Sequence, residues 1–212
     1  MRKVTSRIND YWLVDNVLRP GDTVFDVGAG IGEETLVFAK YTNPNGRIFS
    51  FEANPRTVRC LAKTAQRNGL ESVMIIAAAV TDHAGHVKIT DNRAHIQNSI
   101  LFSDNNSFID VSAVTLDDFV ESHRIDRIDL LKMNIEGAET PALLGFQRNF
   151  NCVRNVAIAC HDWIADLGHS ENYRTLEFVN GFLESQGFFV QRRANDPRPW
   201  IRDTLIGSRC KE

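Results

Sequence analysis

The sequence predicts an α/β fold in which a mostly parallel sheet is flanked by helices. Short β-rich runs alternate with stretches of helical length, and DTVFDVGAGIGEETLVFAK at 22–40 reads as a buried strand, a glycine-rich turn and a helix. Such alternation implies right-handed crossovers between parallel strands. The 212 residues are sufficient for one domain with a sizeable core, so residues 1–212 are expected to form a single domain.

The composition argues against several other classes of protein. Hydrophobic residues make up 43% and charged residues 24%, with a formal net charge of −3, which is typical of a globular protein. The scattered basic residues favour neither nucleic acid nor an anionic membrane as a partner. The polar N-terminus and the lack of an apolar run near 18 residues indicate no signal peptide and no membrane span. The four cysteines lack C-x-x-C spacing, so we expect a reduced, cytoplasmic protein.

The first half of the chain predicts three strands separated by helices. The strands are short β-rich runs bounded by turn residues, at 23–27, 47–52 and 72–80. The helices are expected at 8–18, within an N-terminal segment 1–20, and at 32–41 and 55–68. Asn9 or Asp10 is the expected cap of the first helix, and Pro55 suits the first turn of the third.

Between residues 84 and 114 the regular alternation is interrupted. GHVKIT and FIDVSAV look like two extended segments around a polar loop. That loop contains His95, Asn98 and Ser99, and it either covers an acceptor pocket or is an ordinary surface loop. Further helices are expected at 115–123, with Thr115 as the cap, and at 138–146 and 171–186. Further strands are expected at 128–135 and 153–160, followed by a closing antiparallel pair at 187–193 and 203–209.

The glycine-rich turn raises the question of which ligand it approaches. Gly28, Gly30 and Gly32 have the spacing G-x-G-x-G, whereas the dinucleotide fingerprint places its third glycine one residue later and a P-loop requires Lys followed by Ser or Thr. Glu33 and Glu34 open the next helix, where they would repel a pyrophosphate. The charge favours a ligand with a cationic centre and no phosphate, such as S-adenosylmethionine.

Two carboxylates near this turn are candidates for binding such a ligand. Glu52 closes the second strand, where α/β sheets that bind nucleosides place a carboxylate for the ribose hydroxyls. A carboxylate accepts hydrogen bonds from both hydroxyls, and charge-assisted bonds are roughly twice as strong as neutral ones. Asp26 ends the first strand, and it either reaches the methionine amino group or tethers the amides of the loop.

Six motifs occur in order over residues 20–150: FDVGAGIGEET, FEANP, AVTDHAG, NSI, TLDDF and LKMNIEGAE. Together they resemble the FkbM family of S-adenosylmethionine-dependent methyltransferases. The resemblance implies a class I, Rossmann-like fold with a seven-stranded sheet in the order 3-2-1-4-5-7-6, the last strand antiparallel. It also implies methyl transfer to a hydroxyl of a small molecule, commonly a sugar, a polyketide or another secondary metabolite.

The resemblance directs attention to the ends of the fourth and fifth predicted strands. The family usually has Asp at the position of Asn134, and Asn cannot act as a general base, although it can orient a hydroxyl. An alcohol nucleophile needs a base, and His161 is the preferred candidate, with Asp162 to orient it. Glu136 and Glu139 are either catalytic or N-terminal capping residues of the next helix.

The expected site residues fall into two sets. The cofactor contacts are predicted at Asp26, Gly28, Ala29, Gly30, Gly32, Glu33, Glu52, Ala53, Ala79 and Asn134. The catalytic residues are predicted at His161, Asn134, Asp162 and Glu136. A divalent metal held by Asn134, His161 and Asp162 is an alternative that we do not favour.

Two other functions stay open on the sequence alone. An NAD-dependent oxidoreductase is the first, and the glycine spacing counts against it. A methyltransferase fold that binds the cofactor without catalysis is the second, and Asn134 keeps it open. A homo-oligomer is also compatible with the sequence, because Tyr11 and Trp12 of the first helix can pack on the sheet or on a second subunit.

Overall fold

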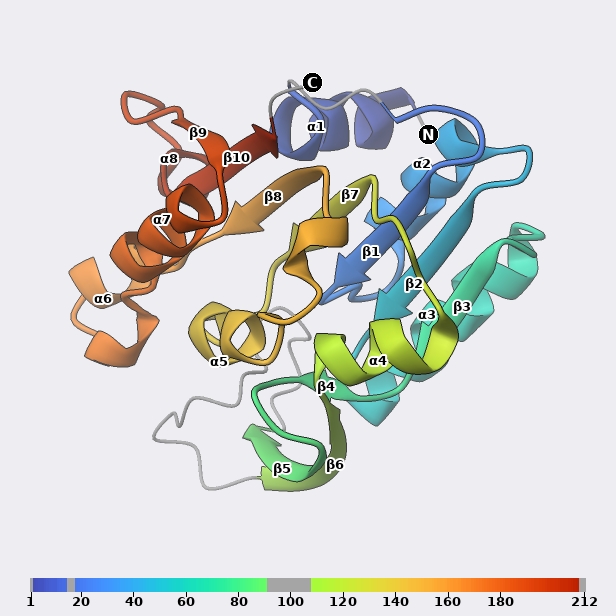
Figure 1. The fold of residues 1–212 in the computed structure, drawn as a ribbon, viewed down its shortest axis with the longest axis horizontal. Coiled ribbons are helices and arrows are strands. Elements are labelled where there is room, and N and C mark those ends of the chain that lie inside the picture. The colour runs from blue at the N-terminus through green and yellow to red at the C-terminus, as the bar shows by residue number, and fades with distance from the viewer. Residues whose placement is uncertain (1, 15–17, 91–107, 210–212) are drawn as a thin grey trace.

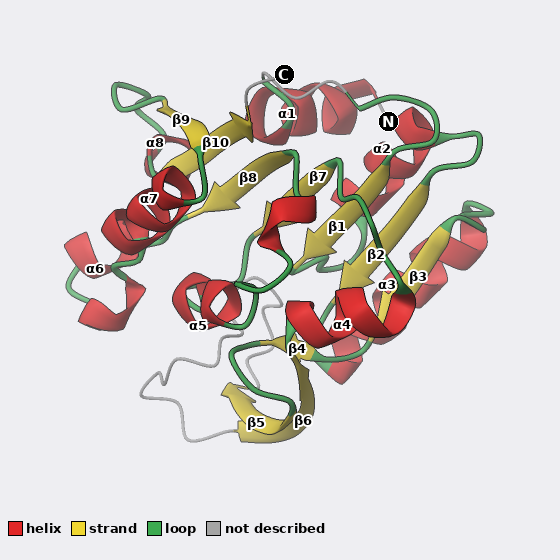
Figure 2. Cartoon of the chain, viewed as in Figure 1, coloured by secondary structure: helices red, strands yellow, loops and turns green. Residues whose placement is uncertain are grey.

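A computed structural model describes residues 2–14, 18–90 and 108–209 of the chain. Its centre is a seven-stranded sheet with the strand order β3-β2-β1-β7-β8-β10-β9 (Figures 1 and 2). The strands of this sheet are β1 (Thr23–Val27), β2 (Arg47–Phe51), β3 (Val73–Ile76), β7 (Leu130–Met133), β8 (Asn155–Ala159), β9 (Phe188–Arg192) and β10 (Thr204–Arg209).

The arrangement confirms the predicted fold class. When the seven strands are numbered along the chain, their order is 3-2-1-4-5-7-6. β1 pairs in parallel with both β2 and β7, while β10 lies antiparallel between β8 and β9. The carboxyl ends of β1, β2 and β7 therefore meet at one edge of the sheet, which is where open α/β sheets bind ligands.

Helices cover both faces of the sheet. α1 and α2 pack on one face, and α4, α5 and α7 lie over the other, in front of the sheet in Figure 1. The helices are α1 (Arg2–Trp12), α2 (Glu33–Thr42), α3 (Pro55–Arg67), α4 (Leu116–His123), α5 (Glu139–Leu144), α6 (Asp162–Asp166), α7 (Leu176–Ser185) and α8 (Pro199–Arg202), with 3₁₀ turns η2 (Phe150–Cys152) and η3 (Glu171–Tyr173). Within the described ranges, no helix is long and apolar enough to cross a membrane.

The central strands are apolar on both sides because helices cover both faces. Neighbouring residues of β1 serve opposite cores: Val24 packs with α1 and α2, whereas Phe25 packs with Phe119 of α4. The rings of Phe25 and Phe119 meet edge to face at 5.8 Å between centroids. Thr115 caps the N-terminus of α4 as predicted, since its hydroxyl accepts a hydrogen bond from the Asp118 amide at 3.0 Å.

A second, three-stranded sheet has the order β4-β6-β5 and lies beyond the carboxyl ends of the central strands. It contains β4 (Ala79–Val80), β5 (Gly85–Thr90) and β6 (Phe108–Val114), so the two extended segments predicted around 84–114 are present. The loop with His95, Asn98 and Ser99 lies outside the described residues. The single strand predicted at 72–80 is wrong, because the chain leaves the large sheet after Ile76 and joins the small one at Ala79. An apolar run does not show which sheet each part of it joins.

The first helix lies earlier than predicted, at Arg2–Trp12 rather than 8–18. Ile8 and Trp12 are its buried residues. Arg193 donates to the backbone carbonyl of Asp10 at 2.6 Å and, with Arg198, binds the Asp10 carboxylate. Cations at the last turn of a helix satisfy its free carbonyls and oppose its dipole, so a distant part of the chain stabilises this end.

The helix predicted at 171–186 is interrupted. The 3₁₀ turn η3 ends at Tyr173, and α7 begins at Leu176. The Asp162 carboxylate accepts hydrogen bonds from the amides of Thr175 and Leu176, both at 3.0 Å, which satisfies the free amides at the start of α7. The start of α7 is therefore set by a residue that follows β8 rather than by the local sequence.

Candidate active site

A cavity of about 290 Å³ opens at the carboxyl ends of β1, β2 and β7. In Figure 1 the arrowheads of β1 and β2 point toward the small sheet, which supplies part of the cavity wall. The lining residues are Arg7, Val27, Gly28, Gly30, Ile31, Glu33, Glu34, Phe51, Glu52, Ala53, Ala78, Ala79, Val80, Ile89, Asn134, Ile135, Glu136 and Ala138.

The turn after β1 requires glycine for two separate reasons. Gly28 has φ of 75°, a conformation that other residues adopt at a cost. A Cβ atom at this position would lie 2.0 Å from the backbone oxygen of Asn134, which follows β7. The first glycine of the motif therefore lets two neighbouring strand ends approach each other at the edge of the cavity.

The backbone of the same turn is held by the end of β2. The amides of Gly28 and Ala29 both donate to the Phe51 carbonyl at 3.0 Å, and the Gly30 amide donates to Oε2 of Glu52 at 3.0 Å. The other carboxylate oxygen of Glu52 accepts from the Asn54 amide at 2.9 Å. Glu52 is thus fixed from both sides while it lines the cavity.

Burial is the main influence on the pKa of the Glu52 carboxyl. It raises the pKa of Glu52 above its ordinary value, while hydrogen bonds from the amides of Asn54 and Gly30 oppose the shift. Each carboxylate oxygen has two lone pairs and accepts one of these two backbone bonds, so further donors can be accommodated. The geometry leaves the carboxylate able to receive hydroxyl groups from the cavity.

A buried ion pair lies directly behind the turn. Lys132 of β7 and Asp26 of β1 are register partners, and Nζ lies 2.9 Å from Oδ1, with side-chain exposures of 1% and 0%. Lys132 also donates to the Gly28 carbonyl at 2.8 Å, and Asp26 accepts from the Thr35 hydroxyl at 2.6 Å. The structure therefore places Asp26 inside the fold, where it does not line the cavity.

Lys132 is a site residue that the sequence motifs did not reveal. It belongs to the motif LKMNIEGAE, in which Asn134, Glu136 and Glu139 drew the functional expectations. The available signal was a charged residue in the middle of a strand expected to be buried, since lysine is almost never fully buried without a partner. Asp26 occupies the corresponding place in the neighbouring strand, so each of the two charged residues indicated that the other was its ion-pair partner.

His161 lies between two glutamates of the segment after β7, one of which, Glu136, lines the cavity. Its Nδ1 is 3.1 Å from Oε1 of Glu139, and its Nε2 is 3.6 Å from Oε2 of Glu136. Burial by itself lowers the pKa of His161, but the carboxylates of Glu139 and Glu136 outweigh it and raise the pKa to about 10. The two carboxylates therefore favour the imidazolium form of the ring, which has no free lone pair with which to accept a proton.

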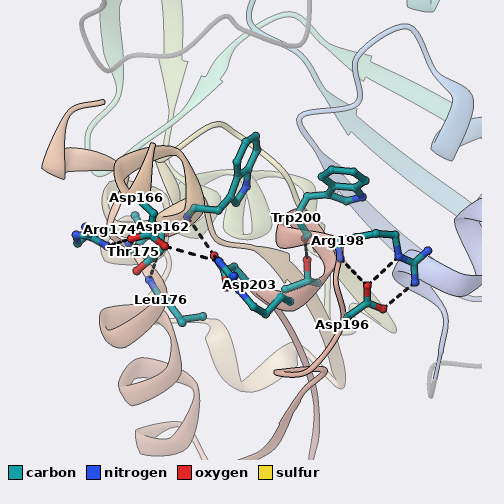
Figure 3. Close-up of polar contacts among 12 residues, drawn as sticks. Asp162, Asp166, Arg174, Thr175, Leu176, Asp196, Arg198, Trp200 and Asp203 are labelled. Carbon is teal, nitrogen blue, oxygen red and sulfur yellow. Dashed lines mark hydrogen bonds and ion pairs between the residues drawn. The ribbon is translucent and has the colours of Figure 1, made fainter. Parts of the chain in front are cut away.

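Asp162 does not orient His161, although the two are adjacent in sequence. Its carboxylate is directed at the start of α7, as Figure 3 shows for the contacts with Thr175 and Leu176. The carboxylates that contact the imidazole ring are those of Glu136 and Glu139, both from the segment after β7. Glu139 is fully buried and also accepts from the amides of Ile135 and Gly137.

The predicted cofactor residues divide into two groups in the structure. Those that line the cavity are Gly28, Gly30, Glu33, Glu52, Ala53, Ala79 and Asn134, and those that do not are Asp26, Ala29 and Gly32. The predicted catalytic residue Glu136 also lines it. Cavity residues that were not predicted are Arg7, Val27, Ile31, Glu34, Phe51, Ala78, Val80, Ile89, Ile135 and Ala138. Most of these are apolar, and the sequence motifs carry no signal for them.

The residues suggested for a metal do not share one centre. His161 lies between Glu136 and Glu139, whereas the Asp162 carboxylate binds backbone amides at the start of α7. In the part of the chain that the structure describes, no group of three or more His, Cys, Asp or Glu side chains is arranged to hold a metal ion.

The strand order and the ligand cavity at the carboxyl edge define the fold of a class I methyltransferase. The chain belongs to the FkbM family of methyltransferases, because the family profile described as "Methyltransferase FkbM domain" matches residues 26–190. The resemblance noted in the sequence is therefore confirmed, and the chain is a methyltransferase.

Individual relatives agree with this assignment. The chain is 28% identical over 205 residues to the 31-O-demethyl-FK506 methyltransferase FkbM of Streptomyces tacrolimicus, covering 82% of this chain and 75% of the relative. It is 23% identical over 179 residues to the hexuronic acid methyltransferase AglP of Haloferax volcanii, covering 82% and 72%.

A solved structure gives the same fold. The methyltransferase FkbM from Methylobacillus flagellatus KT superposes with a TM-score of 0.60 at 18% identity, over 91% of this chain. The present chain spans 48%, or about half, of that protein.

We predict that Gly28→Ala destabilises the fold more than Gly187→Ala. Gly187 has nearly the same φ, 78°, but no atom lies within 4 Å of the place that a Cβ would take, so this change carries the conformational cost alone, about 1–2 kcal/mol. Gly28→Ala adds the overlap with Asn134 and should cost a further ~1–3 kcal/mol or more. Urea denaturation of both variants measures the difference, and equal losses would contradict the close approach.

We also predict a pH-dependent contribution of His161 to stability. The folded chain holds the proton up to a pKa of about 10, whereas an unfolded histidine releases it near 6.5. The contribution is fully present below pH 6.5 and is lost as the pH rises through 10. The difference in free energy of unfolding between the wild type and His161→Gln should therefore shrink over this range. The exposed His169, changed to Gln, is the control, and a constant difference for His161 would contradict the two-carboxylate contact.

Proposed function

We propose that this protein transfers a methyl group from S-adenosylmethionine to a hydroxyl oxygen of a small molecule. The observation that carries the proposal is the charge of the cavity wall. Among the described residues that line it are four carboxylates, those of Glu33, Glu34, Glu52 and Glu136, and one guanidinium, that of Arg7. An excess of negative charge favours a ligand with sulfonium and ammonium groups and disfavours a pyrophosphate.

The residues on the wall fit the parts of such a ligand. Glu52 is placed to accept hydrogen bonds from ribose hydroxyls, since its two oxygens are fixed but not saturated. The apolar residues Phe51, Val80 and Ile89 suit the faces of an adenine ring. Arg7 forms an ion pair with Glu33 at the start of α2, so the N-terminal helix contributes to the same wall.

The reaction requires a hydroxyl to be held beside the methyl donor. Bound S-adenosylmethionine would supply the methyl group, with the carbon–sulfur bond breaking and its electron pair remaining on sulfur as the new carbon–oxygen bond forms. The chain orients the hydroxyl and removes its proton, and orientation alone contributes a large part of the rate. Asn134 lines the cavity, and its side-chain amide is suited to orient a hydroxyl.

The acceptor class follows from the relatives and is part of the proposal. One relative is named as acting on the 31-O-demethyl form of FK506 and the other on a hexuronic acid. Both names describe small molecules rather than macromolecules. We therefore propose a small hydroxylated acceptor for this chain, and no partner macromolecule is needed.

Calorimetry with S-adenosylhomocysteine and with NAD tests the cofactor. We expect S-adenosylhomocysteine to bind and NAD not to bind, because the pyrophosphate would face the carboxylates of Glu33 and Glu34. Binding of NAD alone would refute the proposal and restore the oxidoreductase hypothesis.

We predict that Glu52→Ala weakens the binding of S-adenosylhomocysteine by about 1.5–3 kcal/mol, the range for hydrogen bonds to a charged group. Glu71→Ala is the matched control, since Glu71 is exposed between α3 and β3 and away from the cavity. Isothermal titration of both variants gives the comparison. Unchanged affinity in Glu52→Ala would remove this residue from the ribose role.

A further inference from the structure

We propose that His161 is a positioning residue rather than the base, and that Glu136 is the group that accepts the proton of the acceptor hydroxyl. The inference rests on the proposed function, because it assigns the proton in that reaction. It proposes an alternative to the expectation from sequence, in which His161 was the preferred base with Asp162 to orient it.

The geometry of three side chains carries the proposal. Glu139, His161 and Glu136 form a triad of side chains in which each ring nitrogen of the imidazole lies beside one carboxylate, at 3.1 Å from Glu139 and 3.6 Å from Glu136. Glu139 is fully buried and the His161 side chain is 5% exposed, whereas that of Glu136 is 21% exposed and lines the cavity. Glu136 is therefore the member of the triad that a ligand in the cavity can reach.

Glu139, the buried member of the triad, is held in place by several hydrogen bonds. Glu139 accepts hydrogen bonds from the Gly137 amide at 3.2 Å and from the Thr175 hydroxyl at 3.0 Å. These donors fix the carboxylate that holds Nδ1 of His161, so the ring presents Nε2 toward Glu136. His161 therefore has a carboxylate beside each ring nitrogen, an arrangement that favours the protonated ring, in which neither nitrogen can accept a further proton.

The backbone of Glu136 supports a functional role for its position. Its φ is 54°, in the left-handed region, which costs a residue with a side chain about 1–2 kcal/mol. Residues held in such conformations are concentrated at functional sites. Here the strained backbone directs the Glu136 side chain to a place where it meets both the imidazole and the cavity.

The groups that surround the triad are compatible with Glu136 as the proton acceptor. Of the two carboxylates beside the ring, that of Glu139 is buried, whereas that of Glu136 lines the cavity. Among the described residues, three other titratable groups lie near these glutamates: the hydroxyls of Tyr11 from α1 and Tyr173 from η3, and the thiol of Cys160, which follows β8. Burial raises the pKa of each group, and the carboxylate of Glu139 raises it further. Both hydroxyls are neutral at physiological pH and do not compete for the proton.

The proton balance of the step is simple. The hydroxyl oxygen gains a bond to carbon and loses its bond to hydrogen, and the proton moves to a carboxylate oxygen of Glu136, which becomes neutral. His161 keeps its own proton throughout. Product release and exchange with solvent through the exposed part of Glu136 then restore the carboxylate.

Nitrogen NMR of the ring decides the state of His161 without any acceptor. In protein labelled with ¹⁵N-histidine, we expect His161 to show both ring nitrogens protonated at pH 8, with its signal assigned by its loss in His161→Gln. Glu136→Gln removes one facing carboxylate, so His161 should release its proton at a lower pH than in the wild type. Glu177→Gln, an exposed change on α7, is the matched control.

Two results of this experiment would overturn the proposal. A His161 ring that is neutral at pH 8 in the wild type would make it available as a base. A titration unaltered by Glu136→Gln would show that the two side chains are not coupled. Circular dichroism and thermal unfolding of each variant exclude loss of the fold as the cause of either result.

Binding and turnover measurements separate this inference from the proposed function. Glu136→Gln should bind S-adenosylhomocysteine within about threefold of the wild type but lose roughly 10²–10⁴ in the rate of methyl transfer to a hydroxylated acceptor. His161→Gln should lose less, because Glu136 remains. Failure of the wild type to bind S-adenosylhomocysteine would refute the proposed function, whereas full turnover by Glu136→Gln would refute only the assignment of the base.

Discussion

The buried pair of Lys132 and Asp26 is the interaction on which the rest of the site depends. Two opposite charges lie side by side in adjacent strands with almost no exposure, and transfer of each charge from water costs several kcal/mol. The Thr35 hydroxyl, the Gly28 carbonyl and the face of Trp12, 5.2 Å from Nζ, offset this cost. A pair so enclosed links β1, β7, α1 and α2 at a single point.

The consequence is a rigid glycine turn. Lys132 holds the Gly28 carbonyl from behind, and Phe51 and Glu52 hold the amides of the same turn from β2. Asn134 approaches so closely that only glycine fits. The wall that faces the cavity is therefore fixed before any ligand arrives, and pre-organisation of this kind lowers the entropic cost of binding.

The segment after β7 supplies residues both to the cavity wall and to the buried surroundings of His161. Asn134, Glu136 and Glu139 lie within six positions of one another, yet the first two line the cavity and the third is buried beside His161. Asp162, which follows His161, serves the start of α7 instead. Adjacent residues at a strand end thus point to different partners, which is why their roles could not be assigned from their spacing.

The sequence by itself determined the alternation of strands and helices, the glycine turn, the position of Glu52 at the end of the second strand and the family, because these depend on local periodicity and on motifs. The tertiary structure decided what depends on contacts between distant segments. The position of α1 depends on Arg193 and Arg198, and the division of 72–80 depends on pairing with β6. The protonation of His161 depends on Glu136 and Glu139, two carboxylates about 25 residues away that the fold brings to its ring. A charge in a protein takes its properties from what surrounds it in space, and that information is absent from the neighbouring letters of the sequence.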